Sequence, residues 1–247
     1  MQCIALVTGG MGGGLGEALC IKLAALGNRV VTTFSPSNMK AKDWLKSMRD
    51  QGYSFNAYPC DVANLNSCRE CVGMIENDLG PVNVLVNNAG ITRDMTFKKM
   101  TAEDWDLVIR TNLYSVFNMT KQVMDGMVER GWGRVINISS AVGQKGAYGQ
   151  TNYSASKAGM HGFTKALALE VATKGVTVNT VSPGYIGTRM VKAIPQNILE
   201  SKILPQIPLS RLGNPEEVAG LVAYLASDEA AFVHGANISI NGGQHMF

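Results

Sequence analysis

Short β-branched runs alternate with longer amphipathic stretches along this chain, and that alternation constrains the fold more than any other feature. The expected strands are Cys3–Val7, Arg29–Thr33, Ser54–Tyr58, Val82–Val86, Val135–Ile138, Val176–Val181 and Asn237–Ile240. The expected helices lie near Leu15–Leu26, Lys40–Gln51, Leu65–Asp78, Ala102–Val128, Asn152–Thr173 and Pro215–Ala226. Such alternation forms right-handed βαβ units. The sequence therefore predicts one α/β domain over residues 1–247, a doubly wound parallel sheet of seven strands with helices on both faces.

Charge and terminal sequence exclude two classes of protein. The formal net charge is only +3 and no long basic run occurs, so no nucleic-acid partner is expected. The start, MQCIALVTGG, has the pattern of a strand running into glycines, not of a signal peptide. No stretch reaches the roughly 18 apolar residues of a membrane span, so no membrane partner is expected. We expect a cytoplasmic protein.

The metal-ligating residue types show no pattern typical of a metal site. The five cysteines are thinly spread, which does not suggest a disulfide framework. Cys68 and Cys71 form a C-x-x-C pair without a second pair, a spacing that also fits one buried helix face. The three histidines are His161, His234 and His245, and they lack metal-ligand spacing. We expect no metal.

A glycine-rich segment, TGGMGGGLG from Thr8 to Gly16, lies between the first expected strand and the first expected helix. Glycines let the backbone turn sharply and approach a pyrophosphate, whose charge is stabilised by the helix N-terminus. The segment is therefore typical of a Rossmann fold that binds a dinucleotide, although a glycine-rich turn alone is a weak signal.

The end of the second expected strand indicates which dinucleotide. NAD-binding folds usually place Asp or Glu there for the ribose 2′-hydroxyl, but no acid occurs from Val30 to Lys40. Hydroxyls at Thr33, Ser35 and Ser37 can bond a 2′-phosphate, and Lys40 or Lys42 can offset its charge. This pattern favours NADPH/NADP+ over NAD, unless the two lysines are only solvated charges at a helix start.

A tyrosine and a lysine four residues apart, Tyr153 and Lys157, follow the strand that ends at Ser139–Ser140. On a helix these two side chains share a face. An ammonium group beside a phenol stabilises the phenolate and so lowers the tyrosine pKa. We therefore expect Tyr153 to be a general acid or base near neutral pH, although a Tyr-x-x-x-Lys pair alone is mostly structural.

The motifs taken together identify a family. The glycine segment, CDV at Cys60–Val62, NNAG at Asn87–Gly90, Asn112, NISS, YSASK and SPG at Ser182–Gly184 occur in the order found in the short-chain dehydrogenase/reductases. The sequence resembles this family over essentially its whole length. The resemblance implies an oxidoreductase that transfers hydride between a nicotinamide cofactor and a carbonyl or alcohol.

The resemblance also implies a role for each motif residue. Ser140 would bond the substrate carbonyl, Tyr153 would supply the proton, and Lys157 would hold the nicotinamide ribose and lower the Tyr153 pKa. Asn112 would help to anchor a water that links Lys157 to solvent. The remaining cofactor contacts would come from Gly10, Gly14, Leu15, Gly16, Ser35, Lys40, Asp61, Val62, Asn88, Ala89, Gly90, Pro183, Gly184, Ile186 and Thr188.

The glycine segment departs from the family pattern in one respect. The usual pattern, Thr-Gly-x-x-x-Gly-x-Gly, is restored only if one extra residue is placed beside Thr8. Six of the eight positions from Gly9 to Gly16 are glycine, so we expect the backbone to absorb the insertion. The insertion affects the phosphate contacts most directly.

Within the family the sequence is most similar to bacterial acetoacetyl-CoA reductases and the neighbouring 3-oxoacyl-(acyl-carrier-protein) reductases. The shared segments include GITRDMTFKKM, MTKQVMDGM, KGVTVNTVSPGYI and the ending NGGQHM. The GGMGG start and Trp132 favour the CoA enzymes, which make a precursor of polyhydroxybutyrate, whereas Lys174 keeps the carrier-protein alternative open. The resemblance places an acyl-CoA site at Asp94, Lys99, Ser140, Tyr148, Gln150 and Tyr185, with Lys99 on a phosphate. Lys99 is equally well explained as an exposed loop residue.

Two further expectations complete the sequence interpretation. A protein of this fold that only senses or scaffolds through bound NADP is the competing class, and the intact set of Asn112, Ser140, Tyr153 and Lys157 argues against it.

The helices Ala102–Val128 and Asn152–Thr173 carry more apolar residues than one sheet face needs. Family members use these helices for assembly, so we expect a homotetramer.

Overall fold

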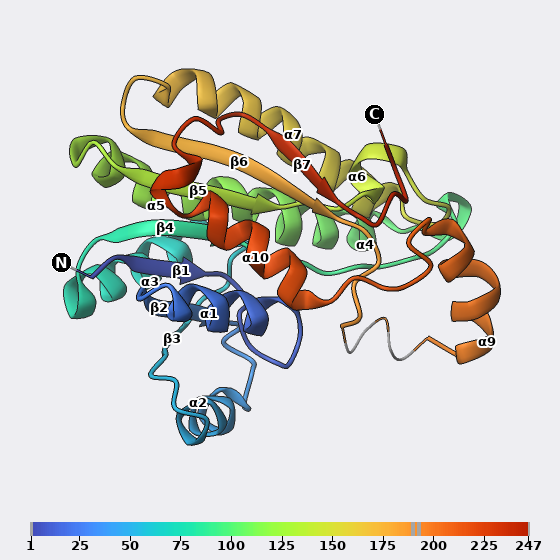
Figure 1. Ribbon diagram of the computed structural model, residues 1–247, viewed down its shortest axis with the longest axis horizontal. Coiled ribbons are helices and arrows are strands. Elements are labelled where there is room, and N and C mark those ends of the chain that lie inside the picture. Colours follow the sequence, from blue (N-terminus) through green and yellow to red (C-terminus); the bar gives the residue numbers. More distant parts are fainter. Residues whose placement is uncertain (1, 189–190, 192–193, 247) are drawn as a thin grey trace.

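The computed structural model describes residues 2–188, 191 and 194–246, and a parallel sheet of seven strands forms its middle layer (Figure 1). The order across the sheet is β3-β2-β1-β4-β5-β6-β7, with every neighbouring pair parallel. The strands are β1 (Ile4–Val7), β2 (Arg29–Phe34), β3 (Asn56–Pro59), β4 (Val82–Asn87), β5 (Gly133–Ile138), β6 (Val176–Pro183) and β7 (Asn237–Ile240). The predicted fold and each of its strands are confirmed.

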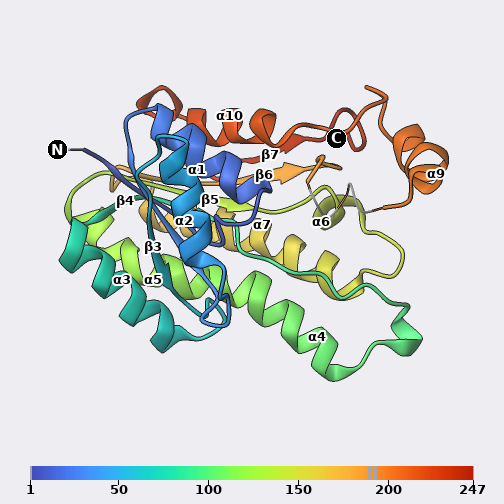
Figure 2. The same ribbon diagram turned by 90° about the horizontal axis from the view of Figure 1, so that it is seen from below.

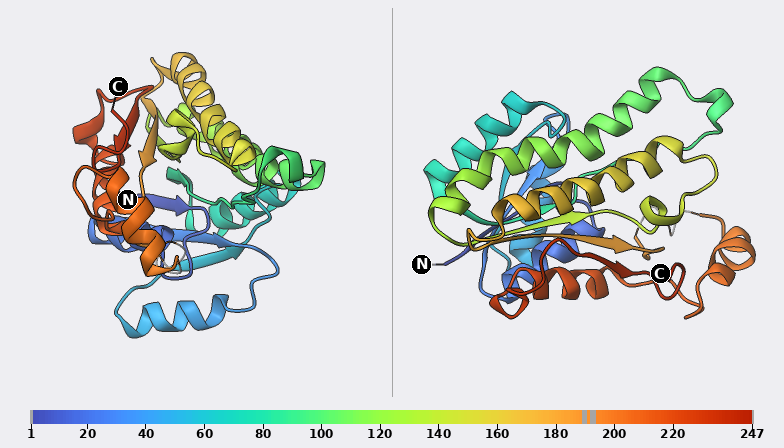
Figure 3. Two further views of the ribbon diagram at one scale, coloured as in Figure 1. Left: turned by 90° about the vertical axis from the view of Figure 1, so that its right-hand side faces the viewer. Right: turned by 90° about the horizontal axis from the view of Figure 1, so that it is seen from above.

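Helices cover both faces of this sheet (Figures 2 and 3). One face is covered by α1 (Leu15–Ala25) and α10 (Pro215–Leu225), and the other by α3 (Leu65–Leu79), α5 (Ser115–Glu129) and α7 (Thr151–Val171). The helix α2 (Ala41–Asp50) packs beside the edge strand β3. Six short helical segments were not expected: η1 (Phe97–Lys99), α6 (Val142–Lys145), α9 (Gln196–Ile198), η3 (Leu199–Ile203), η4 (Leu204–Gln206) and η5 (Asp228–Ala230).

The buried strands supply both cores because successive side chains point to opposite faces. In β1, Ile4 and Leu6 join the core under α3, α5 and α7, whereas Ala5 and Val7 join the core under α1 and α10. This explains why the middle strands are apolar almost throughout. The edge strands β3 and β7 are mostly only half buried.

A chain of polar side chains crosses the apolar interior between three strands and a helix. The amide of Asn87 on β4 donates to Asn137 Oδ1 on β5 at 2.9 Å, and Asn137 Nδ2 donates to Thr164 Oγ1 on α7 at 2.9 Å. Thr164 in turn shares a 2.7 Å hydrogen bond with Thr180 on β6. All four residues are buried, so each bond satisfies groups that water cannot reach.

The loops that follow the strands meet at one edge of the sheet. In Figure 1 the strand arrows point toward the side of the molecule that carries α6 and α9. Ligands of doubly wound sheets bind beyond the carboxyl ends of the strands, so the site is expected at this edge.

Within the described part of the chain, no helix has the length and apolar character needed to cross a membrane.

Candidate active site

The side chains of Ser140 and Tyr153 meet beyond the end of β5. Ser140 lies two residues after that strand, and Tyr153 lies in the first turn of α7. The Ser140 side chain is close enough to the Tyr153 hydroxyl to act on its pKa, and Ser140 Oγ accepts from the backbone N–H of Val142 at 3.2 Å. Two hydroxyl groups are therefore held together, as a carbonyl oxygen that gains negative charge requires.

Lys157 lies one helical turn beyond Tyr153 and is almost completely buried. Its Nζ donates to the carbonyl of Ile138 at 2.8 Å and lies 5.6 Å from the centre of the Tyr153 ring. A Cβ added to Gly90 would lie 3.2 Å from Asn112 Oδ1 and 3.5 Å from Lys157 Nζ. The structure thus brings all four predicted catalytic residues to one place beside Gly90.

The pKa values of this pair differ from the sequence expectation. Burial raises the pKa of Tyr153, and the hydrogen bond with Ser140 opposes that rise only in part. Burial also lowers the pKa of Lys157 to about 7. Burial thus outweighs the lowering of the Tyr153 pKa that the sequence led us to expect, and the influence of Lys157 on this phenol stays a prediction. A raised pKa keeps the phenol protonated at neutral pH, which suits a proton donor.

Asn112 lies in a π-helical turn, η2 (Arg110–Tyr114), that joins α4 (Ala102–Ile109) to α5. The predicted helix over Ala102–Val128 is continuous, but its winding changes at this residue. The Asn112 side chain accepts from Ile91 N at 2.8 Å and donates to Ile91 O at 3.0 Å and to Ser156 Oγ at 3.1 Å. π turns inside helices are frequent at functional sites, and this one fixes the loop that carries Gly90.

The glycine segment has the shape that a pyrophosphate needs. A Cβ on Gly16 would lie 2.5 Å from the Gly9 carbonyl, and one on Gly10 would lie 2.3 Å from Thr32 Oγ1, so both positions require glycine. Gly12 and Gly14, the residue just before α1, have open space where a side chain would project. The N-terminus of α1 lacks a side-chain cap, so its backbone N–H groups are available to an anion. These residues fit a dinucleotide.

Three glycines of this segment adopt left-handed conformations, including Gly9, which follows Thr8 and has φ of 65°. Gly12 has φ of 101° and Gly13 has φ of 69°, a region that other residues seldom adopt. Glu17 on α1 accepts from Gly13 N at 3.0 Å and from Trp44 Nε1 on α2 at 2.6 Å. The widened turn is thus stabilised by the protein itself.

Two threonines near the end of β2 hold the glycine segment, a role that the sequence did not indicate. Thr32 Oγ1 accepts from Gly10 N at 2.8 Å, and Thr33 Oγ1 accepts from Gly9 N at 3.3 Å. Thr33 is buried and already bonded, so the suggestion that it bonds a 2′-phosphate is wrong. Ser35 and Lys40 are exposed beyond the end of this strand, where such a phosphate is expected.

The loop after β4 is joined to the glycine segment. Thr8 Oγ1 accepts from the backbone N–H groups of Asn88 and Ala89, both at 3.0 Å, and Asn88 Nδ2 donates to the Thr8 carbonyl at 3.0 Å. Asp61 and Val62 follow β3 at the same edge of the sheet. The predicted cofactor residues are therefore distributed along this edge.

A cleft of about 720 Å³ opens above Ser140, Tyr153 and Lys157. Its size falls in the range of small-molecule and cofactor sites. The predicted residues on its walls are Leu15, Asn88, Gly90, Asp94, Ser140, Tyr148, Gln150, Tyr153, Lys157, Pro183, Gly184, Tyr185, Ile186 and Thr188. Sequence reasoning missed other wall residues, among them Lys145 on α6, Gln206 on η4 and Gln244 near the C-terminus.

The predicted substrate residues separate into two groups. Gln150 donates to Asp94 at 2.7 Å, and Tyr148 is 93% exposed at the mouth of the cleft. Lys99 lies on η1 and is exposed, but it does not line the cleft formed by the described residues. The site geometry therefore supports Asp94, Tyr148, Gln150 and Tyr185 as wall residues and gives Lys99 no contact with that wall.

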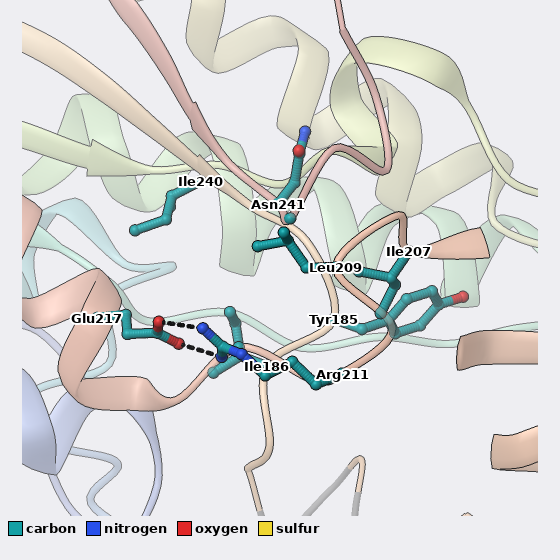
Figure 4. A pocket seen from close by; sticks show the side chains of 10 residues that line it. Tyr185, Ile186, Ile207, Leu209, Arg211, Glu217, Ile240 and Asn241 are labelled. Atoms are coloured by element: carbon teal, nitrogen blue, oxygen red, sulfur yellow. Dashed lines mark hydrogen bonds and ion pairs between the residues drawn. The ribbon is translucent and has the colours of Figure 1, made fainter. Parts of the chain in front are cut away.

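A second hollow, of about 100 Å³, lies behind Tyr185 and Ile186 (Figure 4). Arg211 and Glu217 form a two-pronged ion pair beside it, with contacts of 2.8 Å and 2.7 Å. The hollow is too small for a nucleotide or an acyl thioester. Tyr185 and Ile186 line both the hollow and the cleft, so these two residues form a wall between them.

Two residues that bear on substrate class lie far from the cleft. Trp132 precedes β5, where its ring packs on Arg134 at 4.3 Å and its Nε1 donates to Asp228 at 2.9 Å. Lys174 precedes β6 and is exposed. Both positions are at the amino ends of their strands, opposite the site, so neither can select a substrate by touching it within the cleft.

Across residues 2–188, 191 and 194–246, no His, Cys, Asp or Glu cluster is arranged to hold a metal.

Comparison with known proteins supports one family. The short chain dehydrogenase family matches residues 3–199. The acetoacetyl-CoA reductase of Cupriavidus necator is 57% identical over 99% of both chains, and that of Rhizobium meliloti is 52% identical over 100% of both. A 3-oxoacyl-(acyl-carrier-protein) reductase of Pseudomonas aeruginosa is 43% identical over 98% of this chain and 97% of its own. The chain belongs to the short-chain dehydrogenase family of oxidoreductases.

Proposed function

We propose that this protein catalyses the NADPH-dependent reduction of acetoacetyl-CoA to (R)-3-hydroxybutyryl-CoA. The observation that carries the reaction type is the convergence of Ser140, Tyr153 and Lys157 at one cleft, with the Ser140 hydroxyl acting on the pKa of the Tyr153 phenol. The substrate is inferred from the names of the relatives that match this chain over its full length.

The protein residues stabilise charge and move one proton. Bound NADPH supplies the hydride that reaches the ketone carbon. As charge grows on the ketone oxygen, Ser140 donates a hydrogen bond to it and Tyr153 transfers its phenolic proton to it. Lys157 lies beside the phenol and is positioned to share charge with it, and Asn112 holds the adjacent loop through the backbone of Ile91.

An assay of NADPH consumption tests this proposal directly. Acetoacetyl-CoA and an acetoacetyl thioester of the acyl carrier protein are compared in parallel with the purified full chain. We expect both to be reduced, with the higher kcat/KM for acetoacetyl-CoA and with the (R)-alcohol as product. A protein that reduces neither thioester would contradict the proposal and favour the alternative of an NADP-binding sensor or scaffold.

The carrier-protein reductase remains the second candidate because the Pseudomonas aeruginosa relative carries that name. Its substrate has the same acyl-pantetheine arm but a protein in place of the nucleotide. A higher kcat/KM with the carrier-protein thioester would favour this candidate. The assay therefore separates the two thioester substrates without changing the protein.

The preference for NADPH is proposed to depend on Lys40. Replacing Lys40 with glutamate puts a negative charge where the 2′-phosphate is expected. We expect kcat/KM with NADPH to fall by about ten-fold or more, because one charge-assisted hydrogen bond is lost and repulsion is added. The value with NADH should change little. Lys42→Glu is the matched control, and a larger loss in that variant would assign the phosphate to Lys42 instead.

We also propose that the protein assembles as a homotetramer in the cytoplasm. Apolar side chains remain exposed along the predicted assembly helices, with Leu107 at 42%, Phe117 at 51% and Leu169 at 83% exposure. Contiguous exposed apolar patches mark protein–protein contacts, and we infer that these side chains contribute to such a patch. Solution scattering should give the mass of four chains, and the mass of one chain would contradict the proposal.

A further inference from the structure

The segment that follows β7 is folded into a tight turn by the side chain of Asn241. Its Oδ1 accepts from Gly243 N at 3.0 Å, and its Nδ2 donates to His245 O at 2.8 Å. Gly242 and Gly243 have φ of 63° and 85°, and Leu209 N donates to the Gly242 carbonyl at 3.2 Å. Gln244 is therefore held between two hydrogen bonds made by one side chain.

Gln244 lines the cleft, and its side chain holds an unpaired acceptor that faces Gly184. Its Oε1 is buried and has no hydrogen-bond partner among the described residues. It lies against Gly184, where an added Cβ would be 2.8 Å from it. Three such buried atoms occur in the part of the chain that is described, and only Gln244 belongs to a residue that lines the cleft. A buried unpaired acceptor is costly, so a turn of the Gln244 carboxamide toward a donor bound in the cleft would remove that cost.

The wall around Gln244 has the character of a site for a polar, anionic arm. Gln144 on α6 exchanges hydrogen bonds of 3.1 Å and 3.2 Å with Ser239 on β7, which joins α6 to the strand that precedes the turn. Lys145, the next residue, lines the cleft and is exposed. Figures 1 and 2 show α6 and the C-terminus at the same end of the molecule. An amide acceptor and an ammonium group thus share this end of the cleft.

We propose that Gln244 is a substrate-binding residue whose carboxamide accepts a hydrogen bond from an amide of the substrate's phosphopantetheine arm. This inference rests on the proposed function. A ketone or a thioester has no N–H to donate, whereas the arm contains secondary amides and ends in a phosphate. The carboxamide of Gln244 can accept from such an amide and donate to its carbonyl. The arm is common to CoA and to acyl carrier protein, so Gln244 reads a feature of both.

The test is the substrate dependence of a Gln244→Met variant. Methionine fills similar space without a strong hydrogen-bonding group. We expect KM for acetoacetyl-CoA to rise about three- to ten-fold with little change in kcat. The hydrogen bond that is lost would be equally strong in the ground state and in the transition state. The acetoacetyl thioester of acyl carrier protein should show the same ratio. Ethyl acetoacetate, which has no pantetheine arm, should show unchanged kcat/KM, and KM for NADPH should also stay unchanged.

Controls separate this role from a general loss of structure. Gln51→Met replaces an exposed glutamine beyond α2 and should leave every constant unchanged. Asn241→Ala frees the turn and should reproduce the KM effect in part. An equal loss with ethyl acetoacetate, a raised KM for NADPH, or no change with either thioester would overturn the proposal. Wild-type protein that reduces neither thioester would instead refute the proposed function.

Discussion

Replacing Tyr153 with phenylalanine is expected to lower kcat by about three orders of magnitude, which is within the range that general acid catalysis supplies. The phenol lies beside Ser140 at the cleft and carries a proton to transfer. Phenylalanine keeps the ring and its packing. The affinity for NADPH, measured by fluorescence titration, should therefore stay within about two-fold of the wild-type value.

Tyr224→Phe is the matched control because Tyr224 lies on α10, 40% exposed and away from the cleft. This variant should keep wild-type kcat and KM. Near-normal turnover in Tyr153→Phe would contradict the assignment of the proton donor. A large loss of NADPH affinity in that variant would show that the phenol acts through the cofactor site instead.

Replacing Lys157 with methionine is expected to abolish activity and to stabilise the fold. Activity should fall by more than about 100-fold, because the charge beside Tyr153 is removed. The free energy of unfolding should rise by about 3 kcal/mol at pH 7, because the folded protein no longer has to bury an amine whose pKa it holds near 7. Methionine suits this buried position, although the carbonyl of Ile138 loses a donor.

The pH dependence of this stabilisation gives the sharper measurement. The unfolded lysine has a pKa near 10.5 and binds more protons than the folded one between about pH 7 and pH 10.5. Wild-type stability should therefore rise with pH through that window, and the advantage of the variant should shrink to zero or reverse above it. Denaturant unfolding across this range measures the difference. Lys165→Met, an exposed position on the same helix, should show no such trend. A pH-independent advantage would contradict a buried amine.

The strands and the helices that cover them were predictable because a strand buried on both faces must be apolar along its length. The edge of the sheet that binds the cofactor was predictable from topology, since a glycine-rich segment between the first strand and the first helix is typical of dinucleotide binding. The short segments α6, η1 and η4 were not predictable, because three or four residues carry no detectable period. Of these segments, α6 supplies Lys145 and η4 supplies Gln206 to the cleft wall, which is why those two residues were missed.

The electrostatics of the site were harder to predict than its position. The spacing of Tyr153 and Lys157 correctly places the two side chains on one face, but it gives no information about how deeply that face is buried. Burial reverses the expected direction for the tyrosine pKa. The π turn at Asn112 was also invisible, because one extra residue per turn barely changes the apolar pattern of a long helix. Gln244 is adjacent to the cleft only because β7 pairs with β6.

The hydrogen-bonded chain from Asn87 to Thr180 limits how the sheet can be assembled. If β5 slipped by one residue against its neighbours, Asn137 would point to the opposite face of the sheet. The amides and hydroxyls that it now joins would then face hydrocarbon, each at a penalty of roughly 1–3 kcal/mol. Other registers of these central strands are thus disfavoured because they would leave buried polar groups without hydrogen-bond partners. The loops that carry the catalytic residues are therefore held in one alignment.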